Sequence, residues 1–437
     1  MTKKTFLQIF LRWCARMLLM KYKPTVIGIT GSVGKSSTKE AIAHVLSSVY
    51  DVRKTEGNYN NEIGIPLTII GARSGGHSLW GWLCVFGRWC IAILFPVRYP
   101  KILVLEMGID RPKDMEYLLS FIPIDVAVVT QVSLSHVAFF GSIQAIAKEK
   151  GKLPLAVPAQ GHVILNYDDP RVRKMAEKTK AQVMTYGFDD GAMVHVDNLL
   201  FHRDIRNIDG FSFKLNYAGK SIPVRLPLIV GRHHISAVLG AVGCGIVMKM
   251  NLVEIAQALE AFAPLPGRLQ LLSGREGSSL LDDTYNASPA SVTAALETMK
   301  ELMAPRRVVI LGDMLELGGD AENEHRALAE KIIAGDVHVA ILVGQHMHFL
   351  FEELLNRGFS RKQVFWFPDV FSAFDVACGF LRMGDLVLIK GSRGMRMEKM
   401  TEILLADPAS ARNVLCCQSP EWRDKPFAPP EEWTEKI

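Results

Sequence analysis

Residues Thr30 to Ser37 form a glycine-rich turn of the kind that binds phosphate groups. An apolar run over 25–29 precedes the turn and predicts a buried strand, and the spacing over 38–49 predicts a helix after it. In such a turn Lys35 would reach the β- and γ-phosphates of a nucleotide, and the Ser36 hydroxyl would ligate Mg²⁺. Ile29 stands where the general pattern has its first glycine. The turn therefore predicts a nucleotide site that comprises Gly31, Ser32, Gly34, Lys35, Ser36 and Ser37.

Polar side chains also follow two later predicted strands. Glu106 ends the strand over 102–105 and is a candidate Mg²⁺ ligand, because ligands bind at the carboxyl edge of an open α/β sheet. The alternative is a carboxylate held in a salt bridge. His136 follows the strand over 126–130, but a lone histidine is usually structural. The next predicted helix carries three lysines that, on general grounds, form a solvated face: Lys148, Lys150 and Lys152.

Three predicted strands in the second half of the chain end in polar turns that contain small residues. These turns span 281–289, 311–318 and 389–396. Since several such turns meet at one edge of a parallel sheet, they predict a second ligand site facing the first domain across a cleft.

The alternation of strands and helices predicts an α/β protein with two domains. Residues 24–263 would form a P-loop ATPase domain with a mostly parallel sheet and a small antiparallel addition over 183–230. Residues 264–410 would form a smaller Rossmann-like domain, and 411–437 a loosely ordered tail. The polar loop over 55–66 is predicted to be neither strand nor helix, and 236–262 to be helical.

The amino-acid composition limits the classes of binding partner and the cellular compartment that we expect. A formal charge of +5 over 437 residues, without a basic motif interleaved with aromatic residues, gives no support for nucleic-acid binding. The seven cysteines show neither a C-x-x-C pair nor zinc-type spacing, so reduced thiols in the cytoplasm are expected.

Two apolar segments are candidates for contact with a membrane surface. Residues 1–23 combine apolar and basic side chains, and 79–95 contain three tryptophans and Arg88. Both are too short or too interrupted to span a bilayer, but they suit its interface, on the inner face of the plasma membrane. The alternative is that each packs on the protein's own core.

These landmarks, in this order, resemble the Mur ligases, and the closest members add D-alanyl-D-alanine to UDP-N-acetylmuramoyl-tripeptide. The resemblance runs from about residue 24 to about 405 and rests on 30–37, 58–66, 106–108, 136 with 140–142, 147–151, 282–289, 312–318 and 390–397. It implies that ATP phosphorylates a substrate carboxylate and that an amine attacks the acyl phosphate. Positioning and charge neutralisation carry such a reaction.

The resemblance also implies roles for individual residues. Lys35 would steady the phosphates, and two Mg²⁺ ions would be held by Ser36, Glu106, His136 and Lys150, the last as a carbamylated lysine. Nucleotide contacts would come from Asn60, Asn61, His233, Arg268, Asp283, Tyr285 and Asn286, and substrate contacts from Glu62, Asp313, Lys390, Ser392 and Arg393.

Three departures from the family pattern leave the substrate open. Only 23 residues precede the first strand, where the family has a domain of roughly 80–100 residues that grips the UDP-sugar. One alternative is that a separate substrate-binding polypeptide supplies this domain. His234 and Ala237 replace two asparagines, and 75–100 is an insertion. We therefore weigh three functions: a ligase for peptidoglycan precursors, the same chemistry on a membrane-presented acceptor, and a non-catalytic nucleotide-binding regulator.

Overall fold

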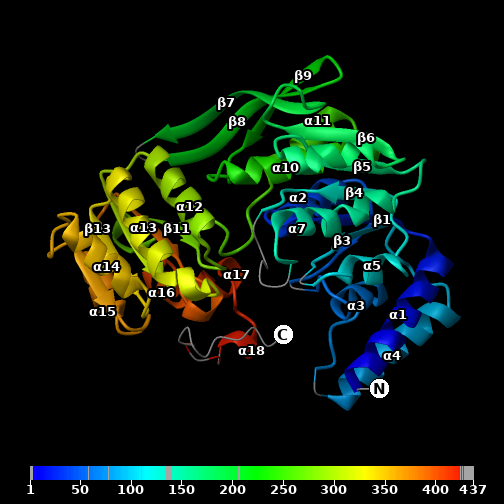
Figure 1. Ribbon diagram of the computed structural model, residues 1–437, viewed down its shortest axis with the longest axis horizontal. Helices are drawn as coiled ribbons and strands as arrows, with labels where there is room; N and C mark the ends of the chain where they lie inside the picture. The colour runs from blue at the N-terminus through cyan, green and yellow to red at the C-terminus, as the bar shows by residue number, and fades with distance from the viewer. Residues whose placement is uncertain are drawn as a thin grey trace. The chain divides into compact units, whose positions relative to one another are not determined.

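The structure is a computed structural model that describes residues 3–57, 59–76, 78–109, 111–133, 140–204, 207–423, 425 and 427. It comprises two compact units (Figure 1). The first takes in residues 1–200, 212–226 and 233–262, and the second 201–211, 227–232 and 263–437. In the described part of the chain, no helix combines the length and apolar character that crossing a bilayer requires.

The first unit is built on a nine-stranded sheet with the order β2-β3-β1-β4-β5-β6-β7-β8-β9. Neighbouring strands from β2 to β7 run parallel. The strands are β1 (Thr25–Thr30), β2 (Val52–Lys54), β3 (Ile102–Glu106), β4 (Val126–Val129), β5 (His162–Asn166), β6 (Gln182–Gly187), β7 (Val194–Asp204), β8 (Asn207–Tyr217) and β9 (Lys220–Leu226). Because β1 lies between β3 and β4, its carboxyl end is a switch point where such sheets bind ligands.

The helices of the first unit connect these strands. They are α1 (Lys3–Tyr22), α2 (Lys35–Ser47), α3 (Gly64–Ile70), α4 (Leu79–Leu94), α5 (Asp114–Leu119), α7 (Ile143–Lys150), α8 (Lys152–Leu155), α9 (Pro170–Arg173), η1 (Lys174–Glu177), α10 (His233–Val247) and α11 (Leu252–Glu260). The turn between β8 and β9 has positive φ at both Ala218 and Gly219, as tight antiparallel hairpins require. The predicted mostly parallel sheet with an antiparallel addition is confirmed, but β6, which falls within the stretch over 183–230 expected to be antiparallel, pairs parallel with both β5 and β7.

The second unit has a six-stranded sheet with the order β10-β11-β15-β12-β13-β14, in which only the β10–β11 pair is antiparallel. Its strands are β10 (Gln270–Ser273), β11 (Ser279–Asp283), β12 (Arg306–Gly312), β13 (Val339–Val343), β14 (Val364–Phe367) and β15 (Asp385–Lys390). Its helices are η2 (Arg275–Gly277), α12 (Pro289–Glu301), η3 (Gly318–Asp320), α13 (Ala321–Ala334), α14 (Met347–Asn356), α15 (Phe374–Phe380), η4 (Arg393–Met395), α16 (Glu398–Leu404), η5 (Pro408–Ser410), α17 (Ala411–Val414) and α18 (Pro420–Arg423). The Rossmann-like expectation is confirmed.

The two apolar segments at 1–23 and 79–95 form α1 and α4, which pack side by side (Figure 1). The Trp89 indole donates to Cys14 O at 3.1 Å, and the Trp13 and Trp89 rings lie 5.2 Å apart. Lys21 donates to the carbonyls of Ala92, Ile93 and Phe95, so α1 caps the carboxyl end of α4. Both helices therefore pack against the protein's own core.

The structure differs in detail from three local expectations. Helix α3 begins at Gly64, inside the loop that was expected to be irregular. The stretch expected to be helical over 236–262 is divided into α10 and α11 by a positive φ at Lys249 and a capping box at Asn251. The tail is ordered over 411–423, because Leu415 and Cys416 are buried and anchor the short helices around them.

Candidate active site

The phosphate loop joins β1 to α2 and is held against the end of β4. Ser32 N donates to Gln131 O at 2.6 Å, and the Thr130 hydroxyl donates to Val33 O at 2.7 Å. Gly31 has φ +153°, and a Cβ there would overlap Thr130 Oγ1, so the position requires glycine. Gly34 has φ +86° and precedes the first turn of α2. The loop therefore presents backbone amides at a helix N-terminus, as an anion site requires.

Two lysines converge on one carbonyl oxygen of this loop. Lys35 Nζ lies 2.8 Å and Lys150 Nζ 2.7 Å from Gly31 O. Lys150 is the last residue of α7 and is only 2% exposed, so it is not part of a solvated face. Two ammonium groups so close together repel each other unless an anion lies between them or one of them changes its charge.

Glu106 ends β3 beside the loop over 55–61. Its backbone N donates to Thr55 Oγ1 at 3.1 Å, and Asn60 Nδ2 donates to its Oε1 at 3.5 Å. The carboxylate is buried, and Lys39 Nζ lies 3.6 Å from its Oε2. Lys39 also lies 3.3 Å from Glu40. The expected alternative of a salt-bridged carboxylate thus holds in the structure. Among the described residues, the buried Glu106 Oε2 at the sheet edge accepts no hydrogen bond.

The second unit gathers predicted residues at the carboxyl ends of β11 and β15. Asp283 and Lys390 are register partners on these strands, and Lys390 Nζ lies 2.6 Å from Asp283 Oδ2. Lys390 also donates to Asn286 O at 2.8 Å. Burial lowers the pKa of Lys390, and the nearby Asp283 carboxylate opposes that shift.

Arginine and aromatic side chains stack beside this ion pair. The Arg268 guanidinium lies 4.1 Å from the centre of the Tyr285 ring, and the Arg393 guanidinium lies 5.4 Å from the same ring. Arg393 is also 3.9 Å from the Trp422 ring, as is the ammonium of Lys425. The arrangement offers aromatic faces and fixed cations together, which suit a nucleotide or an anionic substrate.

Both units of the structure match known protein families. The sequence profile of the Mur ligase middle domain matches residues 29–80 and 93–245, and that of the Mur ligase, glutamate ligase domain matches 267–393. UDP-N-acetylmuramoyl-tripeptide–D-alanyl-D-alanine ligase from Mycobacterium tuberculosis (strain CDC 1551 / Oshkosh) is 30% identical over 407 residues, covering 88% of this chain and 73% of that protein. The Bacillus subtilis (strain 168) enzyme of the same name is 29% identical over 402 residues, with coverages of 92% and 80%. The chain belongs to the Mur ligase family.

Solved structures agree with this Mur ligase in fold. MurF from Acinetobacter baumannii superposes with a TM-score of 0.76 at 24% identity, over 91% of this chain and 80% of that one. MurF from Thermotoga maritima, solved in complex with ADP, gives 0.73 at 24% identity, over 91% and 83%. As a Mur ligase, the chain is an ATP-dependent enzyme that forms amide bonds.

Other predicted residues of this Mur ligase have internal contacts. Asn61 Oδ1 accepts from the amide of Gly64 at 2.9 Å, and Glu62 accepts from Gln8 of α1 at 2.9 Å. Asp313 is fully buried and accepts from two amides at the start of α14, and Ser392 Oγ accepts from Leu315 N at 2.9 Å. His233 is exposed at the first turn of α10. His136 lies outside the described residues. The ligand roles of these residues stay predictions.

Sequence reasoning missed Lys39, Asp282 and Trp422. Lys39 follows Lys35 by four positions, so both lie on one face of α2, and that spacing was a usable signal. Burial raises the pKa of Asp282 to about 7, although the hydroxyls of Thr284 and Thr401 donate to it. Trp422 follows the last predicted helix, and no local pattern connects it to Arg393.

Proposed function

We propose that this Mur ligase joins D-alanyl-D-alanine to the peptide carboxylate of a peptidoglycan precursor. The observation that carries the proposal is the pair Lys35 and Lys150 on Gly31 O of a phosphate loop, in a chain whose relatives bear that ligase name. Glu106 at the neighbouring strand end supplies the carboxylate that phosphoryl transfer commonly uses to hold a metal ion.

The reaction has two balanced steps. A carboxylate oxygen of the acceptor attacks the γ-phosphorus of ATP, the bond to the β-phosphate oxygen breaks, and ADP leaves. The amine nitrogen of D-alanyl-D-alanine then attacks the acyl carbon, the carbon–oxygen bond to phosphate breaks, and the nitrogen loses a proton as the amide forms. Lys35 and the loop amides hold the transferring phosphoryl group in place throughout.

Mg²⁺ fits the residues at the end of β3. The buried Glu106 Oε2 accepts no hydrogen bond in the described part of the chain, and the Ser36 hydroxyl stands at the start of α2. Lys39 Nζ, 3.6 Å from Oε2, is the cation that Mg²⁺ would join or displace. When bound, Mg²⁺ would neutralise charge on the phosphates. A carbamate on Lys150 would replace the repulsion between two ammonium groups by an attraction to Lys35 or to the metal ion. The Mg²⁺ site and the carbamate on Lys150 are both parts of the proposed mechanism.

In the second unit, we assign the stacked pair Arg268 and Tyr285 to the nucleotide, together with Asp283 and Asn286. Lys390 and Arg393 are assigned to the amine substrate, with Ser392 positioning the turn between them. The ion pair of Lys390 with Asp283 holds both residues at the sheet edge, which supports a preformed site.

An ADP-release assay over a panel of acceptors and amines tests the function. We expect ADP release only when a UDP-muramoyl tripeptide and D-alanyl-D-alanine are both present, and none from the Lys35→Ala variant. The exposed Lys101→Ala change is the matched control and should leave turnover unchanged. Turnover on an unrelated acceptor alone would replace the substrate assignment, and no turnover with any pair would favour a regulator.

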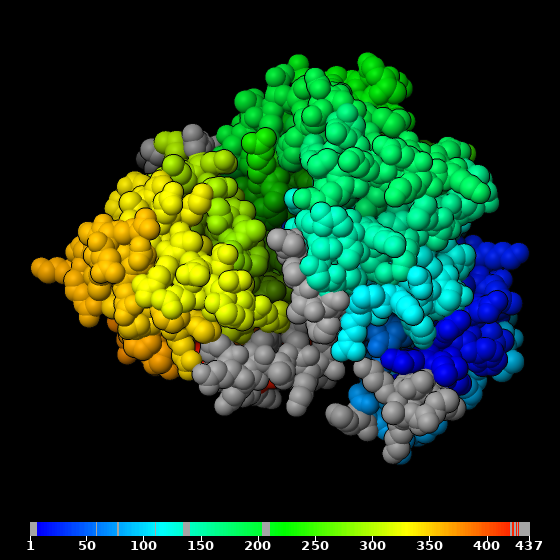
Figure 2. All heavy atoms as spheres, in the orientation of Figure 1, coloured from blue at the N-terminus to red at the C-terminus, as the bar shows by residue number. Residues whose placement is uncertain are grey.

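We also propose that α1 and α4 rest on an anionic membrane surface. Their packing leaves large apolar side chains in solvent: Ile9, Trp13, Met20, Leu79, Trp80, Leu83, Phe86, Ile91 and Leu94. Neither helix contains an acidic residue; α1 carries several basic residues and α4 carries Arg88. Exposed tryptophan and leucine beside basic side chains suit the interface of an anionic bilayer. In Figure 2, the dark blue surface of α1 lies at the outside of the first unit.

Vesicle flotation tests this contact. Deleting either helix would expose the core, because Leu11, Leu18 and Trp89 are buried, so point changes are preferable. A Leu79→Ser/Trp80→Ser/Leu83→Ser variant should lose binding to phosphatidylglycerol vesicles. Met383→Ser, at a side chain that is 86% exposed in the second unit, is the control and should float as the wild type does. Equal recovery of all three proteins in the soluble fraction would contradict the membrane contact.

A further inference from the structure

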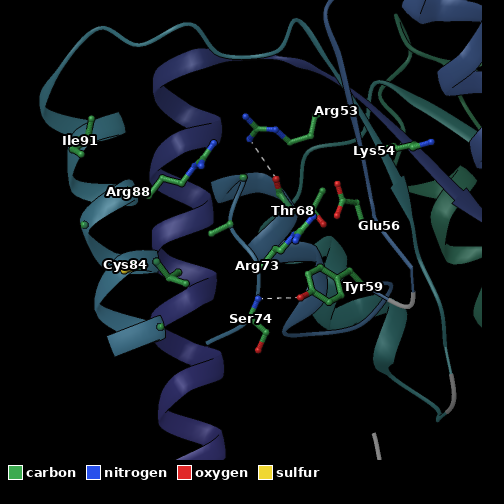
Figure 3. Close-up of a pocket in the computed structure, with 15 residues that line it drawn as sticks. Arg53, Lys54, Glu56, Tyr59, Thr68, Arg73, Ser74, Cys84, Arg88 and Ile91 are labelled. Carbon is green, nitrogen blue, oxygen red and sulfur yellow. Dashed lines mark hydrogen bonds between the residues drawn. The ribbon is translucent and has the colours of Figure 1, made fainter. Parts of the chain in front are cut away.

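A cavity of about 860 Å³ lies within the first unit, between α4, the end of α3 and the segment that follows β2. Figure 3 shows Arg88 and Cys84 approaching it from α4, Arg53 from β2 and Arg73 from the segment after α3, whereas the Lys54 side chain, also from β2, points away from them. The family profile leaves residues 81–92 unmatched, and these residues make up most of α4. One wall of the cavity therefore lies outside the part of the chain that the family profile matches.

The cavity is rich in positive charge. Four cationic side chains line it against the single carboxylate of Glu56. Lys54 is neutralised by an ion pair with Glu40. Arg73 and Arg88 are exposed and form no ion pair among the described residues. Burial lowers the pKa of Arg53, and the positive charge of Arg88 adds to that effect. An anion would relieve this crowding of like charges.

The local structure holds the arginines ready for a ligand. Arg53 donates to Ile69 O at 2.9 Å, and its guanidinium lies 5.0 Å from the centre of the Tyr99 ring. A Cβ on Gly71, where φ is +77°, would come within 2.8 Å of that guanidinium, so glycine makes room for it. Tyr59 OH accepts from Ser74 N at 2.9 Å and ties the two loops of the cavity together. Preformed guanidinium groups bind phosphate oxygens in pairs.

The cavity also borders the loop that contacts Glu106. Tyr59 lines the cavity, and the next residue, Asn60, donates to the Glu106 carboxylate. A ligand in the cavity would therefore lie next to the loop that contacts Glu106, the residue we propose as a ligand of Mg²⁺. We propose that Arg53, Arg73 and Arg88 bind the diphosphate of the acceptor substrate. This inference rests on the proposed function, because peptidoglycan precursors carry their sugar on a diphosphate.

The diphosphate could belong to a uridine nucleotide or to a polyprenyl lipid, and a local probe separates the two. Cys84 is an exposed thiol on the wall of the cavity, so a ligand there should slow its alkylation. The full-length protein, saturated with ADP to fill the phosphate loop, is treated with iodoacetamide alone and with inorganic pyrophosphate, UDP, or phosphatidylglycerol vesicles with and without a polyprenyl diphosphate. We expect pyrophosphate and one of the two carriers to protect Cys84, and the protecting carrier names the source.

The Arg73→Ala/Arg88→Ala variant tests the residues themselves. Both side chains are exposed, so the fold should persist, and pyrophosphate affinity should fall about tenfold per arginine. Arg275→Ala, at an exposed arginine of the second unit, is the control. Unchanged Cys84 alkylation with every probe, or unchanged affinity in the double variant, would overturn the site.

Kinetics separates this inference from the proposed function. The double variant should raise KM for the acceptor without changing KM for ATP or for D-alanyl-D-alanine. Pyrophosphate protection without any turnover would refute the proposed function and leave the site standing. Normal turnover with an unchanged acceptor KM in the double variant would refute the site alone.

Discussion

Replacing Lys150 tests the centre of the mechanism. Lys35 Nζ lies 2.8 Å and Lys150 Nζ 2.7 Å from the same oxygen, which sets an upper limit on the separation of the two ammonium groups. At that limit, and at an effective dielectric constant of about 20, they repel by about 3 kcal/mol, and any shorter separation strengthens the repulsion. A carbamate on Lys150 reverses the sign of that interaction. Lys150→Ala should therefore reduce kcat by about 10²–10³, the usual cost of removing one positioned charge in an active site. Nucleotide binding should remain, because Lys35 and the loop amides still hold the phosphates.

Chemical rescue provides the decisive assay. Lys150 is buried, so its truncation to alanine leaves space that a small carboxylate such as acetate or formate could occupy. We expect acetate to restore part of the ADP release of Lys150→Ala and none of that of Lys150→Met, whose side chain fills the same space. Titration of each variant with a fluorescent nucleotide is the control that shows whether nucleotide binding remains. Full turnover in either variant, or equal rescue of both, would remove a carbamate on Lys150 from the mechanism.

Two further predictions concern the strand ends. Asp282 keeps its proton to a pH of about 7 in the folded protein but ionises near pH 4 when unfolded, so the folded state binds more protons between these values and loses stability as the pH rises. In the wild type, this loss lowers the free energy of unfolding, measured with urea, by at most about 4 kcal/mol between pH 5 and pH 8, and Asp282→Asn should remove it. The exposed Asp375→Asn change is the control and should not remove it. If the free energy of unfolding changes equally with pH in the wild type and in Asp282→Asn, the prediction is contradicted. Gly31→Ala should weaken nucleotide binding about thirtyfold, because backbone strain and overlap with Thr130 cost about 2 kcal/mol. Adding Thr130→Ala should restore part of the lost affinity. Wild-type affinity in Gly31→Ala would refute the steric argument.

The sequence predicted the features that depend on neighbouring residues. Buried parallel strands are near-continuous apolar runs, so β1, β3 and β4 could be located within a residue or two, as could the glycine-rich turn after β1. The meeting of Asp283 and Lys390 also followed, because turns after parallel strands share one sheet edge.

Contacts between residues that are far apart in the chain could not be predicted from the sequence. Residues 1–23 and 79–95 each resembled an interfacial segment, but no local pattern states that Lys21 caps α4 or that Trp89 contacts Cys14. Lys150 misled general reasoning for the same reason, since a lysine on a short helix is usually solvated. Its burial depends on the phosphate loop, which lies more than a hundred residues earlier in the chain.

Helix α4 shows how one inserted segment can serve three surfaces. Val85, Trp89 and Ala92 follow helical spacing and are buried against the core. Cys84, Arg88 and Ile91 follow the same spacing one position earlier and line the arginine-rich cavity. Leu79, Leu83, Phe86 and Leu94 remain exposed. Because Leu79, Leu83 and Phe86 do not line the cavity, changes to them should alter vesicle binding without altering Cys84 protection by pyrophosphate, and Arg88→Ala should do the reverse. Loss of both properties from either change would mean that α4 acts only as packing for the core.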